Sequence, residues 1–215
     1  LQLLWCAEST GQRVAMSRTK SQSSKQSQTL SWLDTATGLW SNAEQLASPH
    51  CDARPTDEVS LLVIHNISLP PGEFGAGYID DLFLGRLDAN AHPYFAGIAH
   101  LKVSAHACIF RDGRVTQYVP TTQRAWHAGE SSYEGRNRCN DFSIGIELEG
   151  TDDEPFTDAQ YQTLIALTRA ILKVYLKITP KRIVGHSNIA PGRKTDPGPH
   201  FDWLRLRAAL TSSAP

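Results

Sequence analysis

Two histidines and one aspartate are the side chains whose types and positions could hold a metal ion. His65 ends the apolar run "LLVIH", and His186 ends the run "RIVGH". Asp196 follows in the segment "GHSNIAPGRKTDPGP", which is rich in proline and glycine and shows no apolar periodicity. Because ligands gather beyond the carboxyl ends of strands in α/β sheets, both histidines are expected to face one crevice, with Asp196 delivered to it by a loop.

This set of side chains suits zinc. A catalytic zinc site takes three protein ligands, drawn from histidine and carboxylate side chains, and leaves a fourth position for water. Histidines so far apart in a sequence do not identify such a site by spacing alone. A single histidine at the end of a strand is more often an ordinary core or surface residue, so that alternative stays open at this point.

A glutamate inside a second apolar run indicates acid–base chemistry. In "FSIGIELEG", Glu147 and Glu149 share one side of a predicted strand, and the isoleucine and leucine side chains share the other. Burying a carboxylate is costly unless it is hydrogen-bonded or functional. Metal-assisted hydrolysis needs a base that takes a proton from water and returns it to the leaving group. The alternative is that both glutamates lie on a solvent-facing side of the sheet.

Lys194 stands two residues before Asp196, so in an extended chain both side chains point the same way. A metal ion would repel the lysine, but a developing oxyanion would attract it. The alternative is a simple ion pair between Lys194 and Asp196.

The composition is that of a globular domain. The chain has 215 residues, of which 40% are hydrophobic and 20% are charged, and its formal net charge is −1. This charge gives no field that favours nucleic acid or an anionic membrane. No run approaches the roughly 20 apolar residues of a membrane-spanning helix. We therefore expect no nucleic-acid or membrane partner, and no obligate protein partner is evident.

The cysteines and the first residues indicate a cytoplasmic protein. The four cysteines are widely spaced, which is typical of reduced thiols rather than of a disulfide framework. The opening "LQLLWCAEST" lacks the positive region, the apolar length and the small-residue cleavage site of a secretion signal.

Residues 1–35 are expected to form a tail that is disordered or not native to the protein. Residues 16–31 are rich in serine and glutamine, with several positive charges, and cannot bury enough apolar surface to become ordered. Residues 1–15 precede Met16, the only methionine, and could lie upstream of the natural start. Order is expected to begin near "SWLDTATGLW", and residues 36–215 are assigned to one domain.

Strand and helix signals alternate through this domain. Strands are expected at residues 60–65, 107–119 (a hairpin that turns at Asp112-Gly113), 142–150 and 182–186. Helices are expected at residues 78–85, from Thr157 to before Pro180, and over "FDWLRLRAAL". At the second of these helices, Thr157 and Gln160 match a capping box, and Phe156 and Tyr161 match a hydrophobic staple. The alternation predicts an α/β fold: a single domain whose central mixed β-sheet is flanked by helices.

Several motifs, in order, resemble a known enzyme family. They are "SLLVIHNISLPPGEFG", "AHLKVSAH", "RAWHAG", "CNDFSIGIELEGTD", "FTDAQYQ", "GHSNIAPGRKTDPGP" and "FDW". From about residue 48 to residue 210 the chain is similar to the zinc N-acetylmuramoyl-L-alanine amidases of the amidase-2, or peptidoglycan-recognition-protein-like, family, and within it to the cytosolic members. The resemblance implies a Zn²⁺ cofactor and hydrolysis of the amide between 1,6-anhydro-N-acetylmuramic acid and L-alanine in peptidoglycan recycling.

The resemblance also implies roles for single residues. His65, His186 and Asp196 match the zinc ligands, Glu147 matches the catalytic glutamate, and Lys194 matches a lysine that helps to stabilise the transition state. Residues expected to contact the anhydromuramoyl-peptide are Asn66, Tyr94, Lys102, Trp126, Arg138 and Arg193. The family commonly has arginine where Lys102 stands, and lysine keeps the charge but loses bidentate binding of a carboxylate.

Two other functions are weighed against this one. A broad cell-wall amidase would act on intact peptidoglycan outside the cytoplasm, and the missing export signal argues against it. A peptidoglycan-binding module without catalysis is the other alternative. Non-catalytic relatives lose a zinc ligand, whereas this chain keeps the full set.

Overall fold

The computed structural model describes residues 32–211. The predicted tail, residues 1–35, lies outside the described residues except for its last four. Within those four, Leu33 is buried and forms an isolated β-bridge with Trp40. The folded domain therefore includes residues 32–35 and begins before the predicted boundary at residue 36.

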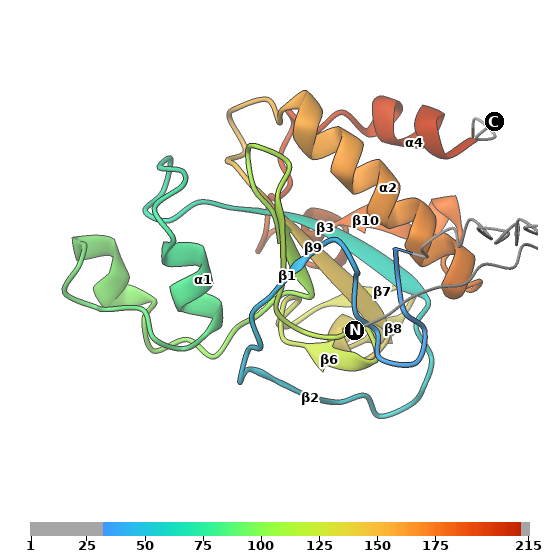
Figure 1. Ribbon diagram of the computed structural model, residues 1–215, viewed down its shortest axis with the longest axis horizontal. Helices are drawn as coiled ribbons and strands as arrows, with labels where there is room; N and C mark the ends of the chain where they lie inside the picture. Colours follow the sequence, from blue (N-terminus) through green and yellow to red (C-terminus); the bar gives the residue numbers. More distant parts are fainter. Residues whose placement is uncertain (1–31, 212–215) are drawn as a thin grey trace, which may run out of the picture.

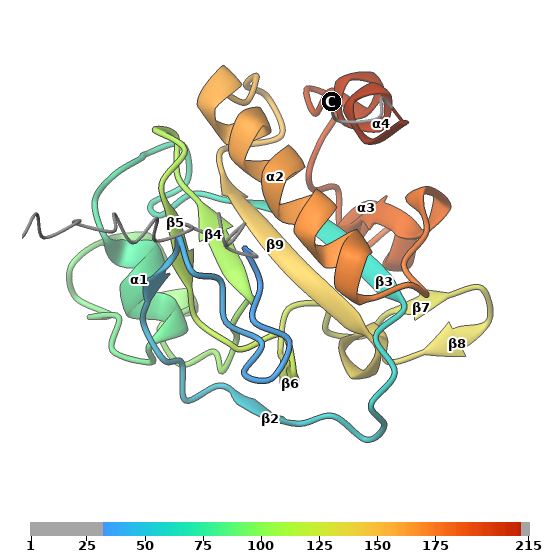
Figure 2. The ribbon, with the colours of Figure 1, turned by 45° about the vertical axis from the view of Figure 1, so that its right-hand side comes forward.

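A mixed sheet of six strands lies at the centre of the part that the structure describes (Figures 1 and 2). Its strands, from one edge to the other, are β1 (Glu44–Gln45), β5 (Val115–Gln117), β4 (Ala107–Ile109), β9 (Ser143–Glu149), β3 (Leu61–Ile67) and β10 (Ile183–Gly185). Neighbours run parallel except for β4 and β5, which form the antiparallel hairpin predicted around Asp112-Gly113. The predicted α/β fold with a central mixed sheet is confirmed.

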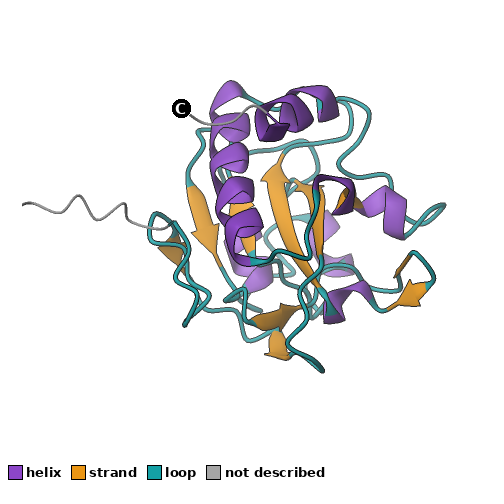
Figure 3. Cartoon of the chain, turned by 90° about the vertical axis from the view of Figure 1, so that its right-hand side faces the viewer, coloured by secondary structure: helices purple, strands orange, loops and turns teal. Residues whose placement is uncertain are grey.

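Helices and short strand pairs surround this sheet (Figure 3). The α-helices of residues 32–211 are α1 (Tyr78–Phe83), α2 (Asp158–Val174), α3 (His186–Ile189) and α4 (Trp203–Thr211). The 3₁₀-helices are η1 (Pro93–Gly97), η2 (Cys139–Asp141) and η3 (Pro180–Arg182). The short antiparallel pairs are β2 (Cys51–Ala53) with β6 (Gln123–Ala125), and β7 (Ser132–Tyr133) with β8 (Arg136–Asn137). No helix in the described ranges is long and apolar enough to cross a membrane.

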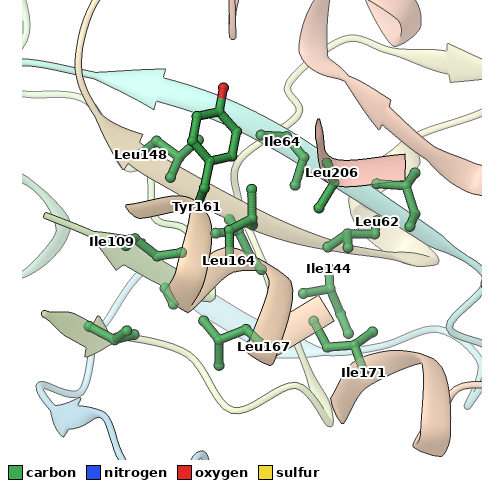
Figure 4. Packing of buried hydrophobic residues seen from close by; sticks show 14 of the residues in the cluster. Leu62, Ile64, Ile109, Ile144, Leu148, Tyr161, Leu164, Leu167, Ile171 and Leu206 are labelled. Atoms are coloured by element: carbon green, nitrogen blue, oxygen red, sulfur yellow. The ribbon is translucent and has the colours of Figure 1, made fainter. Parts of the chain in front are cut away.

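Helix α2 covers one face of the sheet and begins as its sequence predicts. The Thr157 hydroxyl accepts from the Gln160 backbone N–H at 3.1 Å, and the Gln160 side chain accepts from the Thr157 N–H at 3.0 Å. These reciprocal bonds satisfy donors that the first helical turn leaves free. Leu164 of α2 then packs in one cluster with alternate side chains of β3 and β9, among them Leu62 and Ile144 (Figure 4).

The opposite face of the sheet carries different side chains because successive residues of a strand point to opposite sides. Leu61 and Val63 of β3 belong to a separate buried cluster near η2, and His65 continues their row. A third cluster joins α1 and η1 to β4 on this same side, and its members include Phe83 and Phe95. Figure 1 shows α1 and α2 on opposite sides of the strands. This second face is therefore the one on which a site can form.

The last strand ends one residue earlier than predicted. Strand β10 stops at Gly185, and His186 is the first residue of helix α3. The Asn188 side chain accepts from the Gly185 backbone N–H at 2.8 Å, which turns the chain at this point. His186 is thus held by a helical turn at the end of the strand rather than by the strand itself.

The packing of α2 on the sheet predicts a large loss of stability for Leu164→Ala. Leu164 is fully buried, so truncation removes its apolar contacts and leaves a cavity, which costs about 2–5 kcal/mol. Urea denaturation of the metal-free protein measures this. Leu176→Ala is the matched control, because Leu176 is 80% exposed and its truncation changes stability by only about 0.5 kcal/mol or less. Equal losses in the two variants would contradict the assigned core.

Candidate functional site

The register of three parallel strands brings the predicted chemical residues together. Strand β3 lies between β9 and β10, and within it His65 pairs with Glu147 of β9. On the other side Ile64 pairs with Gly185, so His186 follows at the level of His65. Residues that lie far apart in the sequence therefore stand side by side at the carboxyl ends of neighbouring strands.

His65, His186 and Asp196 form a tight triangle of possible ligand atoms. His65 Nδ1 lies 3.0 Å from His186 Nδ1 and 3.0 Å from Asp196 Oδ2, and His186 Nδ1 lies 3.1 Å from the same carboxylate oxygen. Both histidines are buried, and Asp196 is partly buried. Three donor atoms spaced in this way leave room for an ion about 2.0–2.1 Å from each, which is the usual length of a bond from zinc to nitrogen or carboxylate oxygen.

The hydrogen bond behind His186 supports a cation at the centre of this triangle. His186 Nε2 lies 3.1 Å from the backbone carbonyl of Ala128, which can only accept, so Nε2 carries the ring proton. In the neutral ring Nδ1 then presents a lone pair toward Asp196 Oδ2. Two lone pairs facing each other at 3.1 Å repel unless a proton or a cation lies between them. The donor set therefore fits a metal such as zinc.

Glu147 lies in the same pocket with a carboxylate oxygen that lacks a protein partner. It is 8% exposed, and its Oε2 has no hydrogen-bond partner among residues 32–211. Burial raises the pKa of Glu147 well above its ordinary value, the charge of Asp196 adds to this, and Lys194 opposes it. A buried carboxyl group with a raised pKa and a free oxygen is suited to exchanging a proton with a molecule in the pocket.

A pocket of about 360 Å³ opens over these residues and has two unlike sides. One side is polar and holds His65, His186, Asp196, Glu147 and Lys194. The other side is largely apolar and comes from α1, η1 and the segments that follow them; its members include Leu82, Phe83, Tyr94, Ile98, Leu101 and Val103. Such a shape suits a ligand with an apolar or ring-shaped part and a polar group to be acted on.

Three of the residues predicted to contact substrate line this pocket. Asn66 follows His65 and donates to Asp152 Oδ1 at 2.7 Å. Trp126 stacks on His50, with ring centroids 6.1 Å apart, and its indole N–H donates to Asp52 Oδ1 at 3.1 Å. Tyr94 is 46% exposed at the pocket wall, where it can meet a ligand directly.

The three predicted cationic contacts lie elsewhere. Arg193 donates to the carbonyls of Ala128, at 2.7 Å, and Glu130, at 2.6 Å, so its guanidinium supports the chain behind His186. Arg138 and Arg193 line a separate hollow, and Arg138 pairs with Asp141 at 3.2 Å. Lys102 is exposed and does not line the pocket, although Leu101 and Val103 beside it do. Contact of these three with a substrate stays a prediction.

A second layer of residues surrounds the ligand histidines. His127 lies 2.9 Å from His65 Nε2 through its Nδ1, and Ser143 meets the far side of the same ring at 3.1 Å. Ser143 and Gly145 precede Glu147 at alternate positions of one strand, and that spacing is the signal that could have found them. The apolar wall had no such signal, because its residues lie in several separate segments.

Comparison with known proteins bears on what this site does. The family model Amidase_2, described as N-acetylmuramoyl-L-alanine amidase, matches residues 55–199. The 1,6-anhydro-N-acetylmuramyl-L-alanine amidase AmpD of Citrobacter freundii is 64% identical over 178 residues, which are 82% of this chain and 95% of the relative. A crystal structure of a selenomethionine AmpD derivative has a TM-score of 0.80 and 63% identity, and the match covers 82% of this chain and 98% of that one.

A more distant neighbour contains a ligand. It is a complex of the N-acetylmuramyl-L-alanine amidase AmiD from Escherichia coli with the substrate anhydro-N-acetylmuramic acid-L-Ala-D-gamma-Glu-L-Lys. It has a TM-score of 0.54 and 32% identity, and the match covers 79% of this chain and 61% of that one.

The buried histidines predict that the metal-free protein loses stability in mild acid. Burial lowers the pKa of His65 to about 4, and burial also lowers the pKa of His106 and His127 well below 6.5. Between pH 6.5 and about 4 the unfolded chain therefore binds more protons than the folded one, so the free energy of unfolding falls as the pH falls. Urea denaturation at several pH values measures the slope.

Two variants make this test specific. His106→Gln removes one of the buried rings, so its slope with pH is expected to be shallower than that of the unmodified protein. His100→Gln changes an exposed ring and is expected to leave the slope unchanged. A stability that does not vary between pH 6.5 and 4.5 would show that these rings titrate normally in the folded state.

Proposed function

Because the chain belongs to the Amidase_2 family of N-acetylmuramoyl-L-alanine amidases, we propose that it hydrolyses the amide between 1,6-anhydro-N-acetylmuramic acid and L-alanine with the help of zinc. The products are an anhydro-sugar and a free peptide, as required for peptidoglycan recycling in the cytoplasm. The observation that carries the proposal is the triangle of His65, His186 and Asp196 beside the unpartnered carboxylate of Glu147.

The named relatives support the choice of substrate. Identity of 64% to a 1,6-anhydro-N-acetylmuramyl-L-alanine amidase extends over 95% of that relative's length, and the family match over residues 55–199 includes every residue of the pocket. The ligand in the neighbouring AmiD complex has the same sugar and the same first amino acid. The apolar wall with Tyr94 gives a sugar ring a surface to lie on, while the amide reaches the polar side.

The three ligand residues fit zinc, which when bound supplies a Lewis-acid centre that polarises the amide carbonyl and makes water more acidic. Histidine and carboxylate donors are the usual ligands of catalytic zinc. Burial lowers the pKa of His65 to about 4, so this ring is neutral at neutral pH, and the hydrogen bond to the Ala128 carbonyl fixes the orientation of the His186 ring. Asp196 provides the one negative charge in the ligand set.

Glu147 moves the proton in this reaction. Its free carboxylate oxygen accepts a proton from the attacking water as the new carbon–oxygen bond forms. It then gives that proton to the nitrogen of L-alanine as the carbon–nitrogen bond breaks. Lys194 lines the pocket near Glu147 and Asp196, and its positive charge stabilises the oxyanion that develops on the former carbonyl oxygen.

Other predicted residues orient the substrate. Asn66, Tyr94 and Trp126 lie in the pocket wall, where they can contact the sugar and the lactyl group. Lys102, Arg138 and Arg193 lie outside the pocket that holds the ligand triangle. Their positive charges suit the carboxylates of the peptide, which extends away from the cleaved bond.

The experiment that tests this function measures metal content and peptide release together. Purified protein is expected to contain about one zinc per chain, as in other sites with three protein ligands. It releases free peptide from anhydromuramoyl-peptide, loses this activity with a chelator and recovers it with added zinc. Binding of the muropeptide without turnover, at full zinc occupancy, would instead identify a binding module. Faster release from intact peptidoglycan than from anhydromuropeptide would identify a broad cell-wall amidase.

Glu147→Gln separates proton transfer from metal binding. The amide has the shape of the carboxylate but cannot carry the proton, so kcat falls by about 10²–10⁴-fold. Zinc content stays at the level of the unmodified protein, because Glu147 is not a ligand. Glu149→Gln is the matched control on the same face of β9, since Glu149 accepts from the backbone N–H groups of Gly75 and Arg111 instead. A similar loss of kcat in both variants would argue against a special role for Glu147.

A further inference from the structure

The site-facing side of β9 reads Ser143, Gly145, Glu147, and the ring of His127 lies across the first two. A Cβ on Gly145 would come within 2.5 Å of His127 Nδ1, so only glycine leaves room for this ring. The His127 backbone N–H donates to the Asn140 side chain at 3.1 Å, which fixes the segment that carries it. The ring is thus placed by two independent features of the fold.

A chain of hydrogen bonds with one possible direction runs through this ring. The Ser143 hydroxyl donates to the carbonyl of Cys139 at 2.6 Å, and that carbonyl can only accept. Ser143 Oγ has then used its proton and must accept from His127 Nε2, 3.1 Å away. With its proton on Nε2, a neutral His127 has a lone pair on Nδ1, which lies 2.9 Å from His65 Nε2.

We propose that His127, oriented by Ser143, is a positioning residue that holds the ring proton of His65 on Nε2. The Nδ1 atom of His65 then presents a lone pair to the position between His186 and Asp196. The consequence of this arrangement rests on the proposed zinc amidase function, in which His65 is a ligand of the metal. His65 can then bind the metal through Nδ1 without first losing or moving a proton. In this inference His127 and Ser143 act by orienting His65, and not by acting on the substrate.

Both histidine ligands are fixed from one short segment. His127 Nδ1 accepts a hydrogen bond from His65 Nε2. The backbone carbonyl of the next residue, Ala128, accepts a hydrogen bond from His186 Nε2. Arg193 donates to the same carbonyl and keeps it in place. If His127 were reversed, with its proton on Nδ1, it would donate to His65 Nε2 and force the proton of His65 onto Nδ1. That arrangement opposes metal binding.

The test begins with metal-free protein that carries ¹⁵N-labelled histidine. NMR is expected to show His65 in the single form protonated at Nε2. In His127→Phe the ring volume remains but the acceptor is lost, so His65 becomes a mixture of its two tautomers. Zinc affinity, measured by competition with a chromophoric chelator, falls by about 10–100-fold, as for other partners of metal-ligating histidines.

Ser143→Ala provides a second route to the same readout. It keeps the His127 ring but removes the oxygen that orients it, so the Nδ1-protonated form of His65 is expected to appear, and zinc affinity decreases in the same direction. If His127→Phe does not give the dispersed amide spectrum of a folded protein, Ser143→Ala decides the test. His50→Phe is the matched control, because this largely buried ring stacks on Trp126 outside the chain of bonds. It leaves the His65 tautomer unchanged.

The outcomes separate this inference from the proposed function. A His65 ring that stays fully protonated at Nε2 in the folded variants, with zinc affinity within about twofold of normal, overturns the inference. A protein whose His65 tautomer responds as expected, but which binds no zinc and releases no peptide, supports the inference about His127 and removes the proposed amidase function.

Discussion

The parallel register of β9, β3 and β10 is the constraint on which the site depends. It sets Glu147 beside His65 and His65 beside His186, so that acid–base group and ligands come from neighbouring strands of one rigid sheet. A shift of one residue in either pairing would turn the functional side chains into the α2 core and the apolar side chains into the pocket. The leucine and isoleucine side chains that pack beneath α2 therefore also fix the geometry of the site.

Much of this could be predicted from the sequence because it depends on local pattern. Alternation along "FSIGIELEG" correctly separates Glu147 from the core side chains, and the capping signal at Thr157 correctly gives the start of α2. The position of His186 at a strand end was nearly right, although it begins a helical turn. These features follow from period, capping chemistry and turn residues, and all three are visible in short stretches of sequence.

The rest depends on contacts between distant segments, which no local pattern describes. Arg193 looks like a free cation in the sequence, yet it is bound to two backbone carbonyls. The position of His127 against Gly145 of β9 depends on the fold, and the sequence around this histidine does not show it. The apolar wall of the pocket likewise arises where α1 and η1 happen to face the ends of the strands.

The buried cation Arg54 helps to explain why the histidines beside the site remain neutral. Its guanidinium donates to the carbonyls of Thr121, Asn140 and Ser143, and it lies 3.0 Å from His106 Nε2. Burial lowers the pKa of Arg54 only to about 10, so it keeps its charge at neutral pH. Burial is the main cause of the low pKa of His106 and His127, and this nearby positive charge lowers both further. A doubly protonated ring has no lone pair with which to accept a hydrogen bond from its neighbour. The fixed positive charge of Arg54 therefore favours the neutral tautomers that the ligand histidines require.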